Sequence, residues 1–103
     1  MTSYRNTLLI VDDRSDNRYS LEAVVGSFLP GVRVLTAPDA ESGIALVRKE
    51  LPDGVLCDMQ MPKKSGIDLC LELKSSEETV HLPVILMTSH SSTPNLRAQG
   101  LEA

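Results

Sequence analysis

The chain has 103 residues, 42% of them hydrophobic, and a formal net charge of −4 at pH 7. This length indicates one domain, residues 1–103, and the acidic balance without a basic stripe argues against direct nucleic-acid binding. No apolar run approaches the roughly 20 residues of a membrane span and the start of the chain has no secretory pattern, so we expect a cytoplasmic protein.

The first apolar run, residues 8–11, predicts a strand that ends at an acidic pair, Asp12 and Asp13. A helix should follow at once, capped by Ser15 or Asp16. Its predicted buried face consists of four apolar residues at helical spacing: Leu21, Val24, Val25 and Phe28.

Residues 32–36 alternate enough to form a second strand, and the polar Arg33 suits the edge of a sheet. Asp39 is expected to cap the next helix. Gly43 lies in the middle of that helix, where it costs about 1 kcal/mol relative to alanine, and we interpret it as a point of close packing against the sheet. The predicted buried stripe is Ala40, Ile44, Val47 and Leu51.

The third predicted strand, residues 54–57, leads into Asp58 and the sequence DMQMP. Strand-end aspartates often cap a helix or turn the chain. Here, however, Asp12 and Asp13 follow another strand, and open parallel sheets bind ligands at the carboxyl ends of their strands. Three carboxylates that converge there repel one another unless a hard cation joins them, and Mg2+ prefers such ligands. We therefore predict an acidic metal site.

Ser65 should cap a third helix, residues 66–75, although its apolar residues fit a strand almost as well. Helix is favoured because two neighbouring parallel strands need a crossover. Residues 82–87 are nearly all apolar and predict a central fourth strand that ends at Thr88. A short helix over residues 94–101 completes a strict alternation of strands and helices, which indicates an α/β fold.

In order and spacing, these motifs resemble the receiver domain of two-component response regulators. The resemblance implies a doubly wound, flavodoxin-like (CheY-like) parallel sheet with strand order 2-1-3-4. The family continues with a fifth strand, which ends in a lysine-proline pair, and a fifth helix. This sequence ends at Ala103, so we expect the chain to be incomplete at its C-terminus, with the fifth strand missing.

The resemblance also implies residue roles. Asp58 would accept a phosphoryl group from a histidine kinase or a histidine phosphotransfer protein, and Thr88 would be the switch hydroxyl that contacts it. Gln60 and His90 would tune the lifetime of the phosphoryl group. An output domain or downstream protein would read the change. The implied Mg2+ ligands are Asp12, Asp13, Asp58 and the backbone carbonyl of Gln60.

Several alternatives bear on this interpretation. The resemblance implies that the chain is not a conventional enzyme, because a receiver catalyses at most its own phosphoryl transfer and dephosphorylation. A phosphatase of the haloacid dehalogenase type is a rival class, but Gln60 stands where that family has its general acid. A pseudo-receiver, which binds partners without being phosphorylated, remains open because the family's lysine is not in the sequence. Lys63 and Lys64 are interpreted as a solvated charge pair. An uncovered first helix and fourth strand would favour a homodimer.

Overall fold

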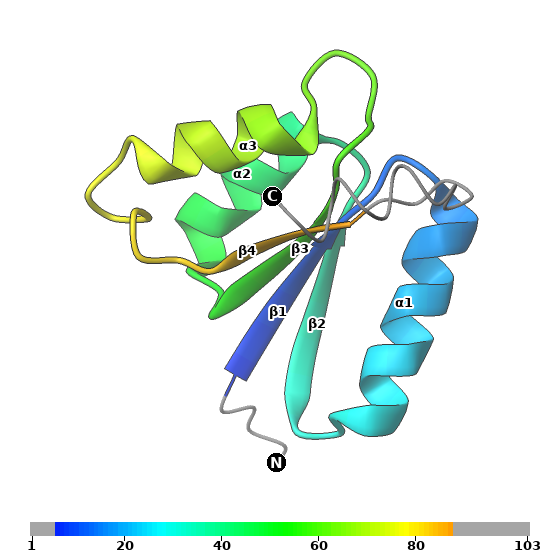
Figure 1. Ribbon diagram of the computed structural model, residues 1–103. Coiled ribbons are helices and arrows are strands. Elements are labelled where there is room, and N and C mark those ends of the chain that lie inside the picture. Colours follow the sequence, from blue (N-terminus) through cyan, green and yellow to red (C-terminus); the bar gives the residue numbers. More distant parts are fainter. Residues whose placement is uncertain (1–5, 88–103) are drawn as a thin grey trace, which may run out of the picture.

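The computed structural model describes residues 6–87. These residues form a four-stranded parallel sheet with the order β2-β1-β3-β4 (Figure 1). The predicted α/β class and strand order are confirmed, whereas the predicted helix over residues 94–101 lies outside the described residues. The elements are β1 Asn6–Val11, α1 Ser15–Phe28, β2 Val32–Ala37, α2 Ala40–Glu50, β3 Gly54–Asp58, α3 Gly66–Lys74 and β4 Val84–Met87.

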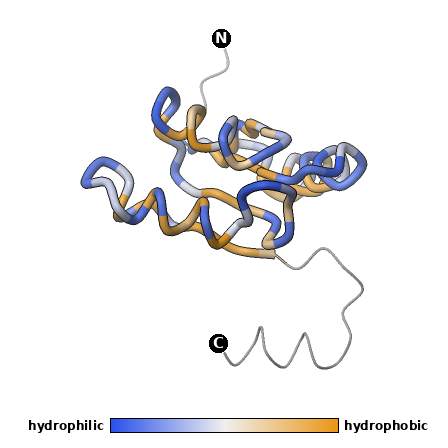
Figure 2. Tube along the Cα trace, turned by 90° about the horizontal axis from the view of Figure 1, so that it is seen from above, coloured by the Kyte–Doolittle hydropathy of each residue, from blue (hydrophilic) through white to orange (hydrophobic). Residues whose placement is uncertain are grey.

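Helices cover both faces of the sheet. Helices α2 and α3 pack together on one face, and α1 lies on the other face against β1 and β2 (Figure 1). Viewed from above, hydrophobic stretches run through the strands, and hydrophilic stretches lie on the outside of the helices and in the loops (Figure 2). None of the helices within residues 6–87 is both long and apolar enough to cross a membrane.

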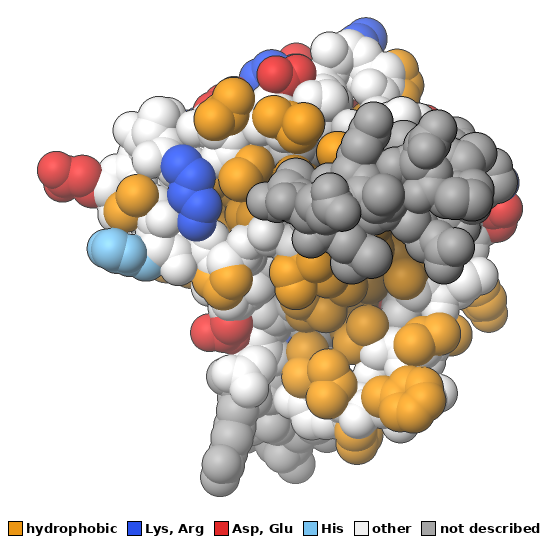
Figure 3. Space-filling model, in the orientation of Figure 1, with side chains coloured by type: hydrophobic (Ala, Val, Ile, Leu, Met, Phe, Trp, Pro, Cys, Tyr) orange, Lys and Arg blue, Asp and Glu red, His pale blue; other side chains and the backbone are white. Residues whose placement is uncertain are grey.

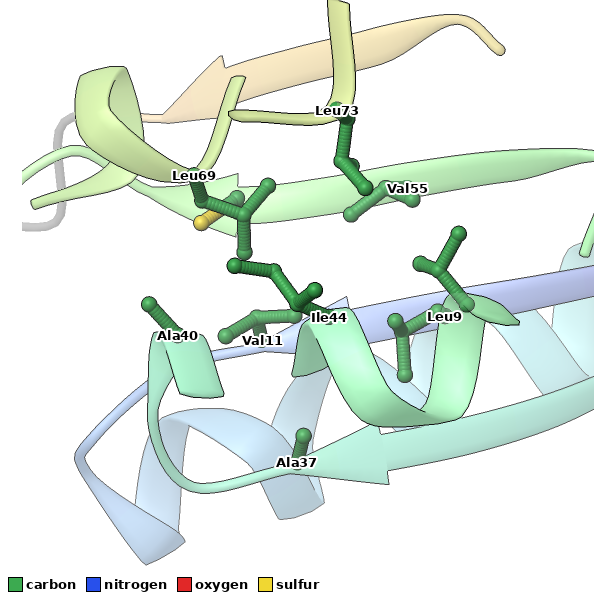
Figure 4. Close-up of a cluster of buried hydrophobic side chains, with 10 residues drawn as sticks. Leu9, Val11, Ala37, Ala40, Ile44, Val55, Leu69 and Leu73 are labelled. Carbon is green, nitrogen blue, oxygen red and sulfur yellow. The ribbon is translucent and has the colours of Figure 1, made fainter. Parts of the chain in front are cut away.

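The main core lies between the sheet and helices α2 and α3 (Figure 4). Alternate residues of β1 and β3 point into it, as the two-residue period of a strand requires. Burial of each large side chain contributes about 1.5–3 kcal/mol, which fixes both helices over the strands that lead to the acidic residues. The large buried side chains are Leu9, Val11, Val47, Val55, Leu69 and Leu73.

Two predicted helix caps and one predicted close contact are confirmed. The Asp39 carboxylate accepts a hydrogen bond of 2.7 Å from the Ser42 N–H at the start of α2. Ser65 and Asp68 form a reciprocal capping box at the start of α3. A Cβ atom added at Gly43 would lie 2.9 Å from a methyl group of Val11, so glycine lets α2 approach β1 closely.

Two local predictions are wrong. The N-cap of α1 is Arg14 without a side-chain hydrogen bond, because the helix begins directly after the acidic loop and leaves Ser15 and Asp16 in its first turn. Leu51 is 62% exposed rather than buried. It lies one residue beyond α2, where a left-handed backbone (φ 48°) turns the chain away from the helix axis.

The predicted face of α1 is also only partly buried, since Val25 is buried whereas Val24 and Phe28 are 52% and 79% exposed.

Strand β4 pairs only with β3 within residues 6–87, so its predicted central position is not found in this part of the chain. Val84 and Leu86 pack against the core, whereas Ile85 points to the opposite face and is 59% exposed. Hydrophobic side chains gather visibly over this face (Figure 3).

Candidate functional site

Three carboxylates meet where β1 and β3 end. Asp12 and Asp13 follow β1, Asp58 is the last residue of β3, and these two strands are parallel neighbours. One oxygen from each side chain lies within 4.8 Å of the other two. Asp12 and Asp58 are each only 1% exposed, whereas Asp13 is exposed. The predicted convergence of the three acidic residues is therefore confirmed.

The position of Asp58 is fixed by the backbone on both sides. Asp58 pairs in register with Met87 of β4, and the N–H of Met59 donates to the Met87 carbonyl at 2.9 Å. The backbone N–H of Gln60 then turns back and donates to Oδ1 of Asp58 at 3.1 Å. This short Asx turn holds the carboxylate at the end of its strand.

Glycine at position 66 brings α3 close to the same point. Its N–H donates to the carbonyl of Met59 at 3.0 Å. An added Cβ would overlap the carbonyl oxygen of Asp58 and lie 3.0 Å from the carbonyl carbon. Any other residue would push the first turn of α3 away from Asp58, so Gly66 is a positioning residue that the sequence reasoning missed.

Asp12 is held by the start of α1. Its N–H continues the ladder to β2 by donating to the Ala37 carbonyl at 3.1 Å. Its Oδ1 accepts from the backbone N–H of Arg14 at 2.9 Å, and Nη1 of Arg18 donates to its carbonyl oxygen at 2.7 Å. Arg18 therefore links the first turn of α1 to the loop that carries Asp12.

Burial dominates the electrostatics of the cluster. It raises the pKa of Asp12 above its ordinary value, and the negative charges of Asp58 and Asp13 act in the same direction. Hydrogen bonds from the Arg14 N–H and from the Asn17 side chain oppose this shift. Burial next to Asp58 and Asp12 also raises the pKa of the Cys57 thiol to about 12, which keeps it protonated at neutral pH.

The donor set fits a hard divalent cation. All three ligand side chains are carboxylates, and the neighbouring thiol is neutral, so the site favours Mg2+ over thiophilic metals. A cation at this point would remove the repulsion that burial otherwise amplifies.

The other predicted site residues divide into two groups. Gln60 lies beside Asp58 in the loop after β3, whereas Thr88 and His90 lie outside the described residues. The two lysines of this loop do not form a purely solvated pair. Lys64 donates to Glu72 at 2.8 Å, an interaction that raises its pKa, and Lys63 is exposed with a left-handed backbone (φ 69°).

A parallel α/β sheet with a buried acidic cluster at the carboxyl ends of its central strands defines the class of this protein. Residues 8–103 match the response regulator receiver domain family, so the chain belongs to that family. Predicted family and fold are both confirmed.

The chain is similar to curated response regulators. It is 36% identical over 96 residues to response regulator PleD of Caulobacter vibrioides. The aligned region covers 93% of this chain and 20% of PleD. It is 39% identical over 82 residues to protein PilH of Pseudomonas aeruginosa. Here the aligned region covers 80% of this chain and 66% of PilH. The chain thus spans about a fifth of PleD.

Solved structures give the same result. A putative response regulator from Chloroflexus aurantiacus superposes with a TM-score of 0.78 at 31% identity, over 94% of this chain and 77% of that chain. The N-terminal domain of a response regulator receiver protein from Methanoculleus marisnigri has a TM-score of 0.77 at 25% identity, over 92% and 76% of the two chains.

Proposed function

We propose that this chain is the phosphoacceptor module of a two-component response regulator. Asp58 would take a phosphoryl group from a phosphohistidine on a histidine kinase or a histidine phosphotransfer protein. The observation that carries this proposal is the cluster of three carboxylate oxygens within 4.8 Å at the ends of β1 and β3. The match of residues 8–103 to the receiver domain family also supports the proposal.

In the proposed reaction, a carboxylate oxygen of Asp58 attacks the phosphorus atom. An oxygen–phosphorus bond forms, the phosphorus–nitrogen bond breaks, and the imidazole leaves and takes up a proton. The Gln60 N–H fixes one carboxylate oxygen, and the contact between Gly66 and the Asp58 backbone fixes the main chain. This fixed position lowers the entropic cost of bringing nucleophile and phosphorus together.

We further propose that Asp12, Asp13, Asp58 and the backbone carbonyl of Gln60 hold Mg2+. When bound, the ion would neutralise negative charge on the phosphoryl oxygens, which is the main requirement of phosphoryl transfer. Arg18 would support the site indirectly, because its hydrogen bond to the Asp12 carbonyl holds the loop that follows β1.

Readout would involve Thr88, as the hydroxyl that contacts the phosphoryl group, and an output domain or downstream protein. Gln60 and His90 would tune the phosphoryl lifetime.

Residues 1–103 would belong to one receiver domain that acts in the cytoplasm. The exposed apolar side chains of Phe28 and Ile85 support self-association of the chain as a homodimer, which sedimentation velocity over a concentration series measures.

Intact-mass analysis tests the phosphoacceptor. After incubation with Mg2+ and the small phosphodonor phosphoramidate, the parent should carry one phosphoryl group that is labile to hydroxylamine. Asp58→Asn should carry none, whereas Asp53→Asn, a matched change at the opposite end of β3, should be modified like the parent. Modification of Asp58→Asn to the same extent would refute the assignment, and an unmodified parent would favour a pseudo-receiver.

A further inference from the structure

A pocket lies at the opposite end of the sheet from the acidic cluster. It has a volume of about 340 Å3 and lies between the segment after α2 (residues 51–53) and the segment before β4 (residues 78–83). These segments lead into the amino ends of β3 and β4, whereas Asp58 lies at the carboxyl end of β3. The phosphoacceptor mechanism therefore makes no use of this pocket.

The walls of the pocket are held by hydrogen bonds within the chain. Nζ of Lys74 donates to the carbonyl oxygens of Val80 at 3.0 Å and Leu82 at 2.6 Å. The buried Thr79 hydroxyl donates to the carbonyl of Leu73 in α3. On the other wall, Asp53 and Thr7 exchange two hydrogen bonds of 2.7 and 2.8 Å. Both walls are therefore preformed, which lowers the cost of binding.

The lining combines apolar surface with an excess of negative charge. Leu51, Pro52 and Leu82 contribute apolar side chains, and Leu51 is 62% exposed although it is large and hydrophobic. Two carboxylates, Asp53 and Glu78, line the same pocket, and neither makes an ion pair within residues 6–87. They outnumber the single ammonium group in the wall, that of Lys74. Acidic, basic, histidine and apolar side chains are visible together at this end of the molecule (Figure 3).

We propose that this pocket binds an extended basic segment of a partner protein. An apolar side chain of the segment would pack between Leu51 and Leu82, and a lysine or arginine two residues further along, on the same face of the segment, would face Asp53 and Glu78. Charge complementarity selects a cationic partner. The volume is near the lower limit of small-molecule pockets, so it suits one or two side chains rather than an enclosed ligand. In an extended peptide, side chains two residues apart lie on the same face, so an apolar and a basic residue at that spacing can fill both parts of the pocket.

The test uses the 103-residue chain and the peptide acetyl-Leu-Ala-Arg-Ala-amide, which places leucine and arginine on one face when it is extended. Titration should produce saturable NMR shifts in the backbone amides of Leu51, Asp53, Thr79 and His81, and leave the amide of Asp58 unchanged. The peptide acetyl-Leu-Ala-Glu-Ala-amide should not bind, because its carboxylate would face those of the pocket. Hexylammonium chloride, which has the same chemistry without a peptide backbone, should bind more weakly than the arginine peptide.

Charge-reversal variants supply the matched control. Glu78→Lys should weaken peptide binding about tenfold or more, because it places a cation against the arginine. Glu77→Lys makes the same change of charge one residue away, outside the pocket. It should alter the Kd of the peptide less than about twofold at about 0.15 M salt, because salt screens exposed charges. Leu51→Asn should also lose binding, because asparagine tolerates the left-handed backbone but removes the apolar wall.

Absence of saturable shifts would overturn the proposal, as would equal effects of the two charge reversals or equal binding of the acidic peptide. Hexylammonium binding as tight as that of the arginine peptide would overturn the assignment to a protein partner. Phosphorylation of Asp58 is not involved in any of these outcomes, so failure of the proposed function would leave this test intact.

Discussion

Replacing Asp12 with asparagine should stabilise the metal-free protein. Asp12 is 1% exposed, and its carboxylate has an oxygen within 4.8 Å of oxygens of both Asp58 and Asp13. At that distance and an effective dielectric constant of about 20, two unit charges repel by roughly 3.5 kcal/mol. Solvent screening at the exposed Asp13 and partial neutralisation reduce this value, so we expect a gain of about 1–3 kcal/mol.

Asparagine keeps the shape of the side chain and can still accept the hydrogen bond from the Arg14 N–H. Urea unfolding at pH 7 in EDTA measures the gain. At a free Mg2+ concentration about ten times its Kd, the parent should gain about 1.4 kcal/mol by linkage. Asp12→Asn should gain much less, because it has lost a ligand. Asp16→Asn, which removes an exposed carboxylate outside the cluster, should behave like the parent.

The pH dependence of this difference follows from the raised pKa of Asp12. A raised pKa in the folded state means that ionisation of Asp12 destabilises the native protein, so stability is lost as pH rises through that folded pKa. The advantage of Asp12→Asn should therefore shrink on acidification and vanish below the unfolded pKa of about 3.9. A variant less stable than the parent in EDTA at pH 7, or equally stabilised by Mg2+, would refute this electrostatic account.

Two further predictions concern residues next to Asp58. Gly66→Ala should lower the free energy of unfolding by about 1–3 kcal/mol and weaken Mg2+ binding, because the new Cβ meets the Asp58 carbonyl. The control Gly26→Ala has open space around the new Cβ and should be neutral or stabilising. Urea unfolding measures both. Iodoacetamide at pH 8 should alkylate the partly exposed Cys70 and spare Cys57, whose pKa is about 12 and which should react only after unfolding. Mass mapping that finds Cys57 modified in the native protein would contradict its burial.

The acidic site could be predicted from the sequence because it depends on few long-range facts. An apolar run followed by aspartate marks a strand end, and parallel strands with helical crossovers place all such ends at one edge of the sheet. Once β1 and β3 are neighbours, Asp12, Asp13 and Asp58 must meet. The helix caps at Asp39 and Ser65 were predictable for a similar reason, since each depends on contacts three residues apart.

The features that the sequence could not supply depend on tertiary packing. Helical spacing gives the apolar face of α1 but not its rotation against the sheet, which buries Val25 and leaves Phe28 exposed. Leu51 continues the stripe of α2 in sequence, but the helix has already ended there. Arg18 and Gly66 contact the site through backbone atoms of Asp12 and Asp58, and no local pattern encodes such contacts.

The two close glycine contacts explain why the acidic residues cannot simply move apart. Gly43 brings α2 against Val11, the residue before Asp12, and Gly66 brings α3 against the backbone of Asp58. The same helices bury Leu69 and Ile44 in the core, so moving either strand end would disturb packing that is costly to open. Repulsion between the carboxylates is therefore retained as electrostatic energy rather than relieved by strand movement. A cation that neutralises this charge should thus stabilise the protein, by about 1.4 kcal/mol at ten times its Kd, while changing its backbone little.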